Sequence, residues 1–361
     1  MSKIEELKVV STIKEKGRNQ LVDVLRGIAM LLVVLGHTMT GCIADAHSTF
    51  LYNIVWSLQM PLFFLISGYV TRYSKPVVTV KNVFEMICRR TLAYILPWSI
   101  WSIIISGFLF RSGDSFNFKY LIFHLDTGYW FLVVIWIISI MHIVASYASS
   151  KIKKTIPQFL VYMTVYVLAD GLLLVLGRGL GMSFMGIKYA LYYSIFYLIG
   201  RTFARISANN FKIESKSCNK LFCGVGKEVI VAICTFVYLY FLTRYHLFNL
   251  SDGIRDIIIR FIASLAGCVT ICSTIDALMS KKSGWGGFRL LEAVGVHSIE
   301  IYLTHYLLLT LIQITPSPEM NSIEGASLLL VNFIVTIVMT WVVITILEQN
   351  RLLKYVLYGK K

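Results

Sequence analysis

Long apolar runs separated by short polar segments fill almost the whole chain, and this pattern predicts the secondary structure. A helix that crosses the ~30 Å hydrocarbon core of a bilayer needs about 20 consecutive, mainly apolar residues. The sixth apolar run is interrupted by Lys188. We predict ten transmembrane helices, over residues 27–44, 51–70, 92–110, 129–149, 158–177, 184–200, 228–243, 256–279, 296–314 and 325–347.

The overall composition agrees with this pattern. Of the 361 residues, 57% are hydrophobic and only 15% are charged, and the mean hydropathy of +0.71 lies outside the range of soluble domains. The expected fold class is therefore all-α, a polytopic integral membrane protein with about ten transmembrane helices. Its predicted parts are a polar N-terminal segment over 1–20, a transmembrane domain over 21–350 and a short basic tail over 351–361.

Lysine and arginine residues are distributed unevenly between the two sides of this arrangement. With the N-terminus inside, the cytoplasmic segments hold 26 of the 34 Lys and Arg residues, and the opposite segments hold six. Because short cytoplasmic loops collect basic residues, we expect both termini in the cytoplasm and a multi-pass protein of the cell membrane. Basic loops beside anionic membrane lipids also account for the net charge of +15, so no nucleic-acid partner is expected.

The stretch DVLRGIAMLLVVLGHT, residues 23–38, places an arginine and a histidine in the first predicted helix. Eleven residues make about three helical turns, so Arg26 and His37 share one face about 16 Å apart, and Asp23 can pair with Arg26. For Arg26, simple extension to the lipid headgroups is an equally good explanation. An imidazole near the membrane midplane needs a protein interior or a wet cavity, which favours a functional role for His37.

The ninth predicted helix repeats this pattern in GVHSIEIYLTHYLLL. Ser298, Tyr302 and His305 are spaced by four and then three residues, so they lie on one helical face. The lead-in FRLLEAVG places His305 about 15 Å into the membrane, at a depth similar to that of His37. We therefore predict that the two histidines share a site. The alternative is that Tyr302 and His305 only hydrogen-bond between helices.

Two further features lie at the cytoplasmic ends of the second and third predicted helices. In MPLFFLISGY, Ser67 and Gly68 permit close helix packing, an explanation at least as good as a functional one. The loop that follows holds five cations, Arg72, Lys75, Lys81, Arg89 and Arg90. These cations agree with a cytoplasmic loop, and a diphosphate-bearing ligand would need such a cluster as well.

Five stretches stand out in this order: RNQLVDVLRGIAMLLVVLGHT, MPLFFLISGY, RRTLAYILPW, GYWFLVVIW and HSIEIYLTHYLLL. Together they resemble the membrane-bound acyltransferase family 3, and within it the branch that is similar to fucose 4-O-acetylases. The resemblance implies that residues 21–350 form an acyltransferase domain. It also implies an O-acyltransferase that moves an acyl group, usually acetyl from cytoplasmic acetyl-CoA, to a hydroxyl of a cell-envelope polysaccharide or its lipid-linked precursor.

The resemblance also assigns roles to residues. It implies that His37 is the essential histidine and that Arg26 is the helix-one arginine. It further marks Ser67 to Tyr69, Arg90, Trp130 to Leu132, and Tyr302 to His305. This chain departs from the pattern at Gln59, where relatives often have histidine, and at Ala93, where many have arginine.

Acetyl-CoA is expected to place its phosphates at the cytoplasmic mouth of the site, because planar guanidinium groups bind phosphate in a bidentate manner. The residues predicted to hold it are Arg26, Arg72, Arg89, Arg90 and Ser67. The pantetheine arm would then extend along the first helix toward the midplane histidine.

At the reacting end, His37 is expected to act as general base on the acceptor hydroxyl or to take the acetyl group as an acyl-imidazole. His305 and Tyr302, with Ser298 as a weaker candidate, would orient that imidazole or donate to the developing oxyanion. No metal is expected. The expected partners are a glycan or lipid-linked glycan acceptor, membrane lipids and proteins of envelope polysaccharide assembly.

Two other classes of protein fit part of the pattern. A proton-coupled transporter or glycan flippase would also use ten helices and mid-membrane histidines, although the chain shows no repeated half. A structural or sensory membrane subunit would tolerate substitution of both His37 and His305. Fold class alone does not separate these from an enzyme.

Overall fold

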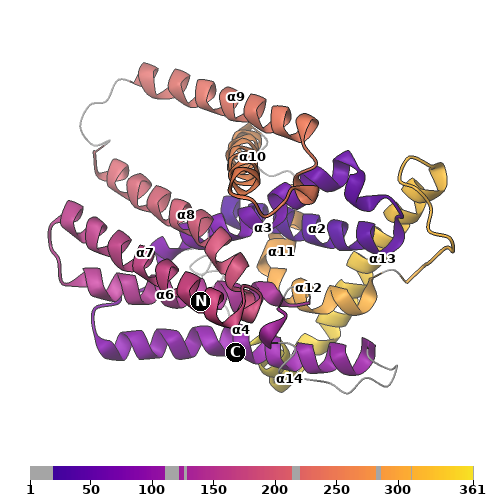
Figure 1. The fold of residues 1–361 in the computed structure, drawn as a ribbon, viewed down its shortest axis with the longest axis horizontal. Coiled ribbons are helices and arrows are strands. Elements are labelled where there is room, and N and C mark those ends of the chain that lie inside the picture. The colour runs from indigo at the N-terminus through magenta and orange to yellow at the C-terminus, as the bar shows by residue number, and fades with distance from the viewer. Residues whose placement is uncertain are drawn as a thin grey trace, which may run out of the picture.

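The computed structural model describes residues 19–109, 122–125, 128–213, 220–281, 286–309 and 311–360, and every regular element in them is helical (Figure 1). Most of the predicted N-terminal segment, 1–18, lies outside the described residues. The long helices are α2 (Gln20–Cys42), α3 (Phe50–Tyr69), α4 (Val80–Leu109), α6 (Trp130–Ser150), α7 (Thr155–Leu180), α8 (Ile187–Ile213), α9 (Lys220–Arg244), α10 (Ile254–Lys281) and α13 (Ile323–Glu348). The shorter ones are α11 (Gly286–Val296), α12 (Ser298–Thr304) and α14 (Arg351–Tyr358), with 3₁₀ turns η1 (Ala46–Ser48), η2 (Val70–Tyr73), η3 (Phe184–Gly186), η4 (Leu247–Asn249) and η5 (His305–Leu308).

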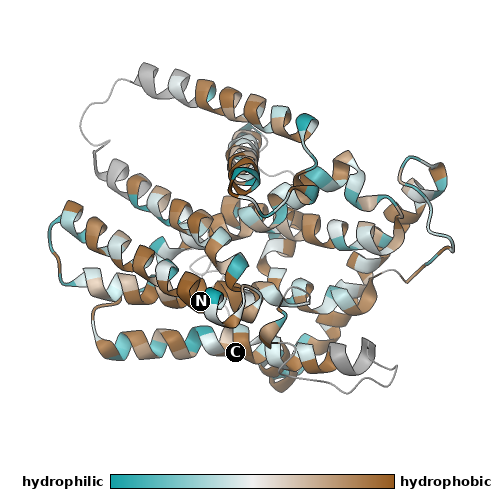
Figure 2. Cartoon of the chain, viewed as in Figure 1, coloured by the Kyte–Doolittle hydropathy of each residue, from teal (hydrophilic) through white to brown (hydrophobic). Residues whose placement is uncertain are grey.

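Several helices have the length and composition of membrane spans. Among the described residues, six meet both conditions: α2, α3 with η2, α6, α7, α10 and α13. Apolar residues cover the outer helices α7 and α13 (Figure 2), where Leu168 and Ile334 are more than half exposed. An apolar outer surface of this kind suits a hydrocarbon environment.

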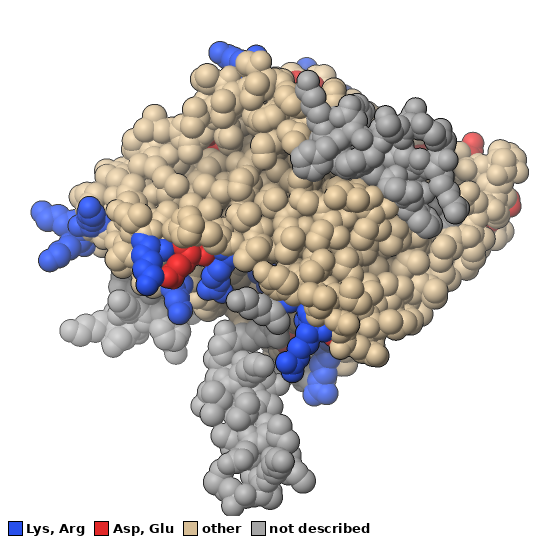
Figure 3. All heavy atoms as spheres, turned by 90° about the horizontal axis from the view of Figure 1, so that it is seen from below, with Lys and Arg blue, Asp and Glu red and all other residues tan. Residues whose placement is uncertain are grey.

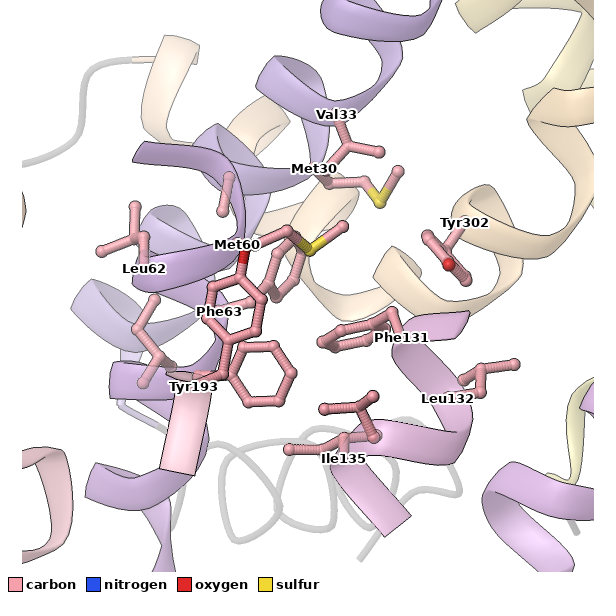
Figure 4. Packing of buried hydrophobic residues seen from close by; sticks show 14 of the residues in the cluster. Met30, Val33, Met60, Leu62, Phe63, Phe131, Leu132, Ile135, Tyr193 and Tyr302 are labelled. Atoms are coloured by element: carbon pink, nitrogen blue, oxygen red, sulfur yellow. The ribbon is translucent and has the colours of Figure 1, made fainter. Parts of the chain in front are cut away.

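The apolar core forms where α2, α3, α6, α8 and α12 converge (Figure 4). Helix α2 packs against α3, α11 and α13, and α3 packs in turn against α8. The core side chains labelled in Figure 4 are Met30, Val33, Met60, Leu62, Phe63, Phe131, Leu132, Ile135, Tyr193 and Tyr302. This cluster fixes α2, which carries His37, relative to α12, which leads directly into His305 of η5.

Two glycine pairs bring helix backbones into direct contact. A Cβ atom at Gly27 of α2 would overlap the Leu291 carbonyl of α11, and one at Gly295 would overlap a carbonyl of α2. The same reciprocal arrangement joins Gly68 of α3 to Gly200 of α8. Such contacts are open only to glycine. The close packing predicted at Gly68 is therefore confirmed.

The prediction of one continuous helix over 296–314 is wrong. The chain forms α11, breaks at His297, continues as α12, tightens into η5 and leaves the helical conformation at Leu309, whose backbone is extended. The reason lies in α13, where the buried Asn332 side chain pairs with both the N–H and the carbonyl of Ile312 at 3.1 and 2.9 Å. Irregular backbone is tolerated at membrane depth where side chains satisfy it in this way.

The segment predicted as a basic tail forms α14, which packs against α4 and α12. The Trp101 indole of α4 donates to the Leu357 carbonyl at 2.8 Å. The Tyr358 hydroxyl lies 3.0 Å from the Thr304 hydroxyl, and burial raises the pKa of Tyr358 to about 12. Lys360 forms an ion pair with the fully buried Glu300 of α12. Residues 351–360 therefore hold α12 in place through these contacts.

Candidate functional site

Three aromatic rings from two helices form the centre of the candidate site. The His37 ring of α2 lies 5.4 Å from the His305 ring of η5 and 4.8 Å from the Tyr306 ring, measured between centroids. His305 and Tyr306 are 4.9 Å apart, so the three rings are mutually packed. The Tyr306 hydroxyl lies 3.4 Å from Nε2 of His37. The structure thus brings together the two histidines that the sequence placed at one depth.

His305 is held in one tautomer. Its Nδ1 lies 2.9 Å from the Ile301 carbonyl oxygen, and because a carbonyl only accepts, Nδ1 carries the proton. In a neutral imidazole the other nitrogen, Nε2, then has a lone pair. This atom is enclosed by the protein and has no hydrogen-bond partner in the part of the chain that the structure describes. His305 is therefore arranged to accept a proton at Nε2 rather than to donate one.

Tyr302 occupies a different position from the one expected. Its ring lies 6.0 Å from that of His305 and packs against Phe131 and Tyr129 at 5.4 and 5.8 Å. Its hydroxyl points toward the Gly128 carbonyl, 3.5 Å away. The side chain that reaches His37 belongs to Tyr306. Ser298, the third member of the predicted stripe, is half-buried at the start of α12.

A second tyrosine supports the ring cluster from α6. The Tyr129 hydroxyl donates to the Leu303 carbonyl at 2.6 Å, and the Tyr129 ring packs edge-on against Tyr306 at 5.5 Å. This hydrogen bond satisfies a carbonyl near the end of α12, where the helical ladder stops. Tyr129 therefore helps to fix the turn that carries His305 and Tyr306.

Arg26 lies on the same helix as His37, eleven residues earlier, which is about 16 Å along the axis. Its Nη1 is 3.4 Å from Oδ1 of Asp23, so the predicted pair is present. The Asp23 side chain is 5% exposed and that of Arg26 is 30% exposed. Helix α2 begins at Gln20 and is capped by Asn19, so Arg26 stands within the helix rather than at its frayed end.

The remaining predicted donor-binding residues lie in the last turn of α3, on η2 and in the third turn of α4. Arg72 is exposed on η2 and donates to the Tyr69 hydroxyl at 2.8 Å. Arg90 is half-buried and donates to the Tyr94 hydroxyl at 3.0 Å, whereas Arg89 is exposed. Ser67 is half-buried, one residue before the glycine contact with α8. Among the described residues, none of these four side chains contacts the three packed rings.

Tyr306, Gln59 and His142 are further polar residues that the sequence interpretation did not assign to a site. Gln59 of α3 has a buried amide oxygen without a hydrogen-bond partner among the described residues, and this oxygen faces Gly36, next to His37. His142 of α6 is buried and lies 3.0 Å from the Tyr162 hydroxyl through Nδ1. A histidine within a predicted span was the available signal for His142. An aromatic hydroxyl directly after His305 was the signal for Tyr306.

One group of side chains has the composition of a metal site. The ligand atoms of His297, Glu300 and Glu348 lie within 4.8 Å of one another. Two lysines also reach this group, since Lys354 pairs with Glu348 at 3.4 Å and Lys360 pairs with Glu300. These ammonium groups supply the positive charge that a cation would otherwise provide, so the group is described here as an ion-pair network.

Comparison with known proteins gave one match. The family model described as an acyltransferase domain, of acyltransferase family 3, matches residues 19–348. The match includes α2, α12 and η5, and therefore both histidines and Tyr306. Neither the curated proteins nor the solved structures gave a match.

Proposed function

The chain belongs to acyltransferase family 3, and from this premise we propose that it transfers an acetyl group from cytoplasmic acetyl-CoA to a hydroxyl of a cell-envelope polysaccharide or of its lipid-linked precursor. The observation that carries the proposal is the packed group of His37, His305 and Tyr306. Two imidazoles and a phenol at one point supply proton acceptors and a hydrogen-bond donor, which acyl transfer to a hydroxyl requires.

The proposal includes ten membrane crossings with both termini in the cytoplasm. In addition to the six apolar spans, α4, α8 and α9 have 30, 27 and 25 residues, each long enough to cross the core. Helices α11 and α12 with η5 together form the remaining crossing. Most of the Lys and Arg side chains visible in Figure 3 lie along the lower margin of that face, a few stand at the upper edge, and a broad uncharged area lies between. This grouping supports one cytoplasmic side.

Acetyl-CoA is proposed to enter from that side. Arg26 stands about 16 Å from His37 on the same helix, and a linear pantetheine arm spans a distance of this order. Asp23 holds the Arg26 guanidinium in place, while part of the side chain remains exposed to receive phosphate. Arg72, Arg89 and Arg90 are proposed to add positive charge on the cytoplasmic side.

The chemical step balances without a metal. The acceptor oxygen bonds to the thioester carbonyl carbon, the carbon–sulfur bond breaks, and the hydroxyl proton passes through an imidazole to the sulfur of coenzyme A. His305 is suited to take that proton because no group among the described residues donates a hydrogen bond to its Nε2. Tyr306 donates to His37 or to the carbonyl oxygen as negative charge develops there. In the alternative route, His37 takes the acetyl group first.

The test is transfer of radiolabelled acetyl from acetyl-CoA in membrane vesicles. We compare the native protein with His37→Ala, His305→Asn and the control His246→Ala, all at matched membrane abundance. His246 is exposed in a loop away from the ring cluster. Loss of the acid–base group is expected to slow labelling of the glycan fraction by about 10² to 10⁴ fold. His246→Ala is expected to match the native protein.

Four results would contradict parts of the proposal. Equal labelling by the native protein and both site variants would remove the histidines from the reaction. Labelling by a different acyl-CoA but not acetyl-CoA would change the donor. Acetyl label that stays on denatured native protein, but not on His37→Ala, would replace the general-base route by the acyl-imidazole route. Uptake of a glycan without acyl transfer would favour the transporter.

A further inference from the structure

A cavity of about 390 Å³ lies away from the ring cluster, under the segment that follows α3. Residues 71, 72 and 74–78 form one side of it. The rest comes from the C-terminal part of α6, from residues 201, 204 and 205 of α8, from Gln158 of α7 and from Met86 of α4. Its volume falls in the range of small-molecule sites. We call this cavity the basic pocket.

The charge of the basic pocket has one sign. Four cationic side chains line it, Arg72, Lys75, Arg201 and Arg205, and none of its lining residues is acidic. In the described part of the chain, no ion pair neutralises any of these four. The α6 side of the pocket contributes hydroxyl groups, those of Ser146, Ser149 and Ser150. The Ser149 and Ser150 hydroxyls donate to backbone carbonyls of α6, so the donors available for phosphate are the guanidinium and ammonium groups.

Arg201 is the central observation. Its guanidinium stacks on the Tyr162 ring, 3.5 Å from the centroid. Its Nε and Nη1 atoms are enclosed and have no hydrogen-bond partner among the described residues. Enclosed N–H groups without acceptors are costly, and a charged acceptor compensates for that cost best. The guanidinium is therefore oriented for a ligand that brings its own oxygen atoms.

The surrounding structure holds Arg201 in this position. Its backbone belongs to the tight α3–α8 crossing, where a Cβ at Gly68 would approach the Arg201 N–H to 3.0 Å. Arg205, one turn later, donates to the Thr155 carbonyl at 3.0 Å and to Oε1 of Gln158 at 3.1 Å. The two arginines, one turn apart on α8, are thus held against α7 before any ligand binds, which lowers the entropic cost of binding.

We propose that the basic pocket binds a phosphate or pyrophosphate group. The chemistry fits the phosphates of coenzyme A and the phosphate of an anionic lipid headgroup equally well. Only the coenzyme source rests on the proposed function. Arg72 and Lys75 belong to the loop cations noted in the sequence, whereas Arg201 and Arg205 belong to none of its motifs.

Binding is measured with the purified full-length protein in nanodiscs. The probes are radiolabelled coenzyme A, inorganic pyrophosphate and phosphatidylglycerol, the last detected as lipid retained by the protein. The variants are Arg201→Gln, Arg201→Lys and Lys75→Gln, with Arg351→Gln as a control. Arg351 is an exposed cation on α14 and does not line the pocket. Lys75 is exposed, so Lys75→Gln tests the pocket even if Arg201→Gln fails to fold.

Arg201→Gln is expected to weaken binding of pyrophosphate and of one other probe at least tenfold, with Arg201→Lys and Lys75→Gln between it and the native protein. If the other weakened probe is coenzyme A, the natural ligand is the coenzyme. If it is phosphatidylglycerol, the natural ligand is a lipid headgroup. Native binding of all three probes by both Arg201→Gln and Lys75→Gln overturns the proposal. If the native protein transfers acetyl but both pocket variants bind all probes normally, only the pocket proposal is refuted. If pyrophosphate binding depends on the pocket but the native protein transfers no acyl group, only the proposed function is refuted.

Discussion

His37 and His305 differ in what their neighbours allow them to do. The Ile301 carbonyl fixes the proton of His305 on Nδ1 and leaves Nε2 as an acceptor. His37 instead has a phenol at its Nε2, 3.4 Å away, which donates to it or accepts from it. Under the proposed function the two rings would therefore take complementary parts in proton transfer, although they are the same residue type.

Tyr306 is expected to matter more for catalysis than Tyr302. Tyr306→Phe removes the hydroxyl beside His37, whereas Tyr302→Phe removes one that faces a backbone carbonyl at 3.5 Å. Loss of one hydrogen bond of about 1 to 1.5 kcal/mol lowers kcat roughly tenfold. We expect that loss for Tyr306→Phe and less than a threefold change for Tyr302→Phe. Initial rates of acetyl transfer at matched abundance check this, and the reverse order would restore the role predicted for Tyr302.

The sequence located the histidines but not their immediate partners. The depth of His37 and His305 follows from counting residues along helices, which needs only the 1.5 Å rise. Choosing Tyr302 over Tyr306 assumed a regular α-helix through residue 314. The chain leaves that geometry at His305, because Asn332 satisfies the backbone further on. A partner defined by a distant side chain is not visible in local spacing.

At the scale of helices, the contact between α2 and α11 positions the first part of α2, which carries Arg26. Gly27→Ala places a methyl group against the Leu291 carbonyl, an obstacle made of backbone. We expect a loss of about 1–3 kcal/mol in stability, seen as a lower thermal midpoint in detergent. Gly171→Ala in α7 is the matched control, because nothing lies within 4 Å of its Cβ position. That control should be neutral or slightly stabilising. Equal midpoints for the two variants would show that the α2–α11 contact is not tight.

The ion pair between Glu300 of α12 and Lys360 predicts different effects for the loss of one charge and for the loss of both. Lys360→Ala leaves the fully buried Glu300 carboxylate without its ammonium partner and is expected to cost about 3 kcal/mol. The double variant Glu300→Gln/Lys360→Ala removes both charges and should recover most of that loss. Thermal midpoints of the native, single and double variants provide the measurement. A double variant as unstable as Lys360→Ala would mean that the charge pair itself is stabilising.

At the scale of the molecule, the ten proposed crossings fix the side on which each loop lies. Lys153→Cys, between α6 and α7, is expected to react with a membrane-impermeant maleimide only after the cytoplasmic side is opened. Asp252→Cys, before α10, is expected to react in intact cells. Both positions are exposed, and both variants are made in a background without reactive native cysteines. Labelling of both from the same side would contradict the proposed topology.

Hydropathy and charge predicted the all-helical fold well because a bilayer leaves few alternatives for the backbone. Helices began and ended within a few residues of the predicted bounds where the chain is regular, as in α6 and α13. The basic pocket was not predicted. It depends on Arg201 and Arg205 of α8 meeting η2 and α7, and tertiary contacts of that kind leave no periodic signal in the sequence.

The ring cluster joins residues 269 positions apart, so its members are synthesised at different times. At about 5–20 residues per second, Tyr306 is synthesised roughly 13–54 s after His37. During that interval α2 is already made, with its imidazole in place and its partners not yet translated. A ribosome that stops before residue 305 leaves a lone polar ring at membrane depth, which is costly. Synthesis of residues 305 and 306 therefore completes the ring cluster and removes that cost at the same time.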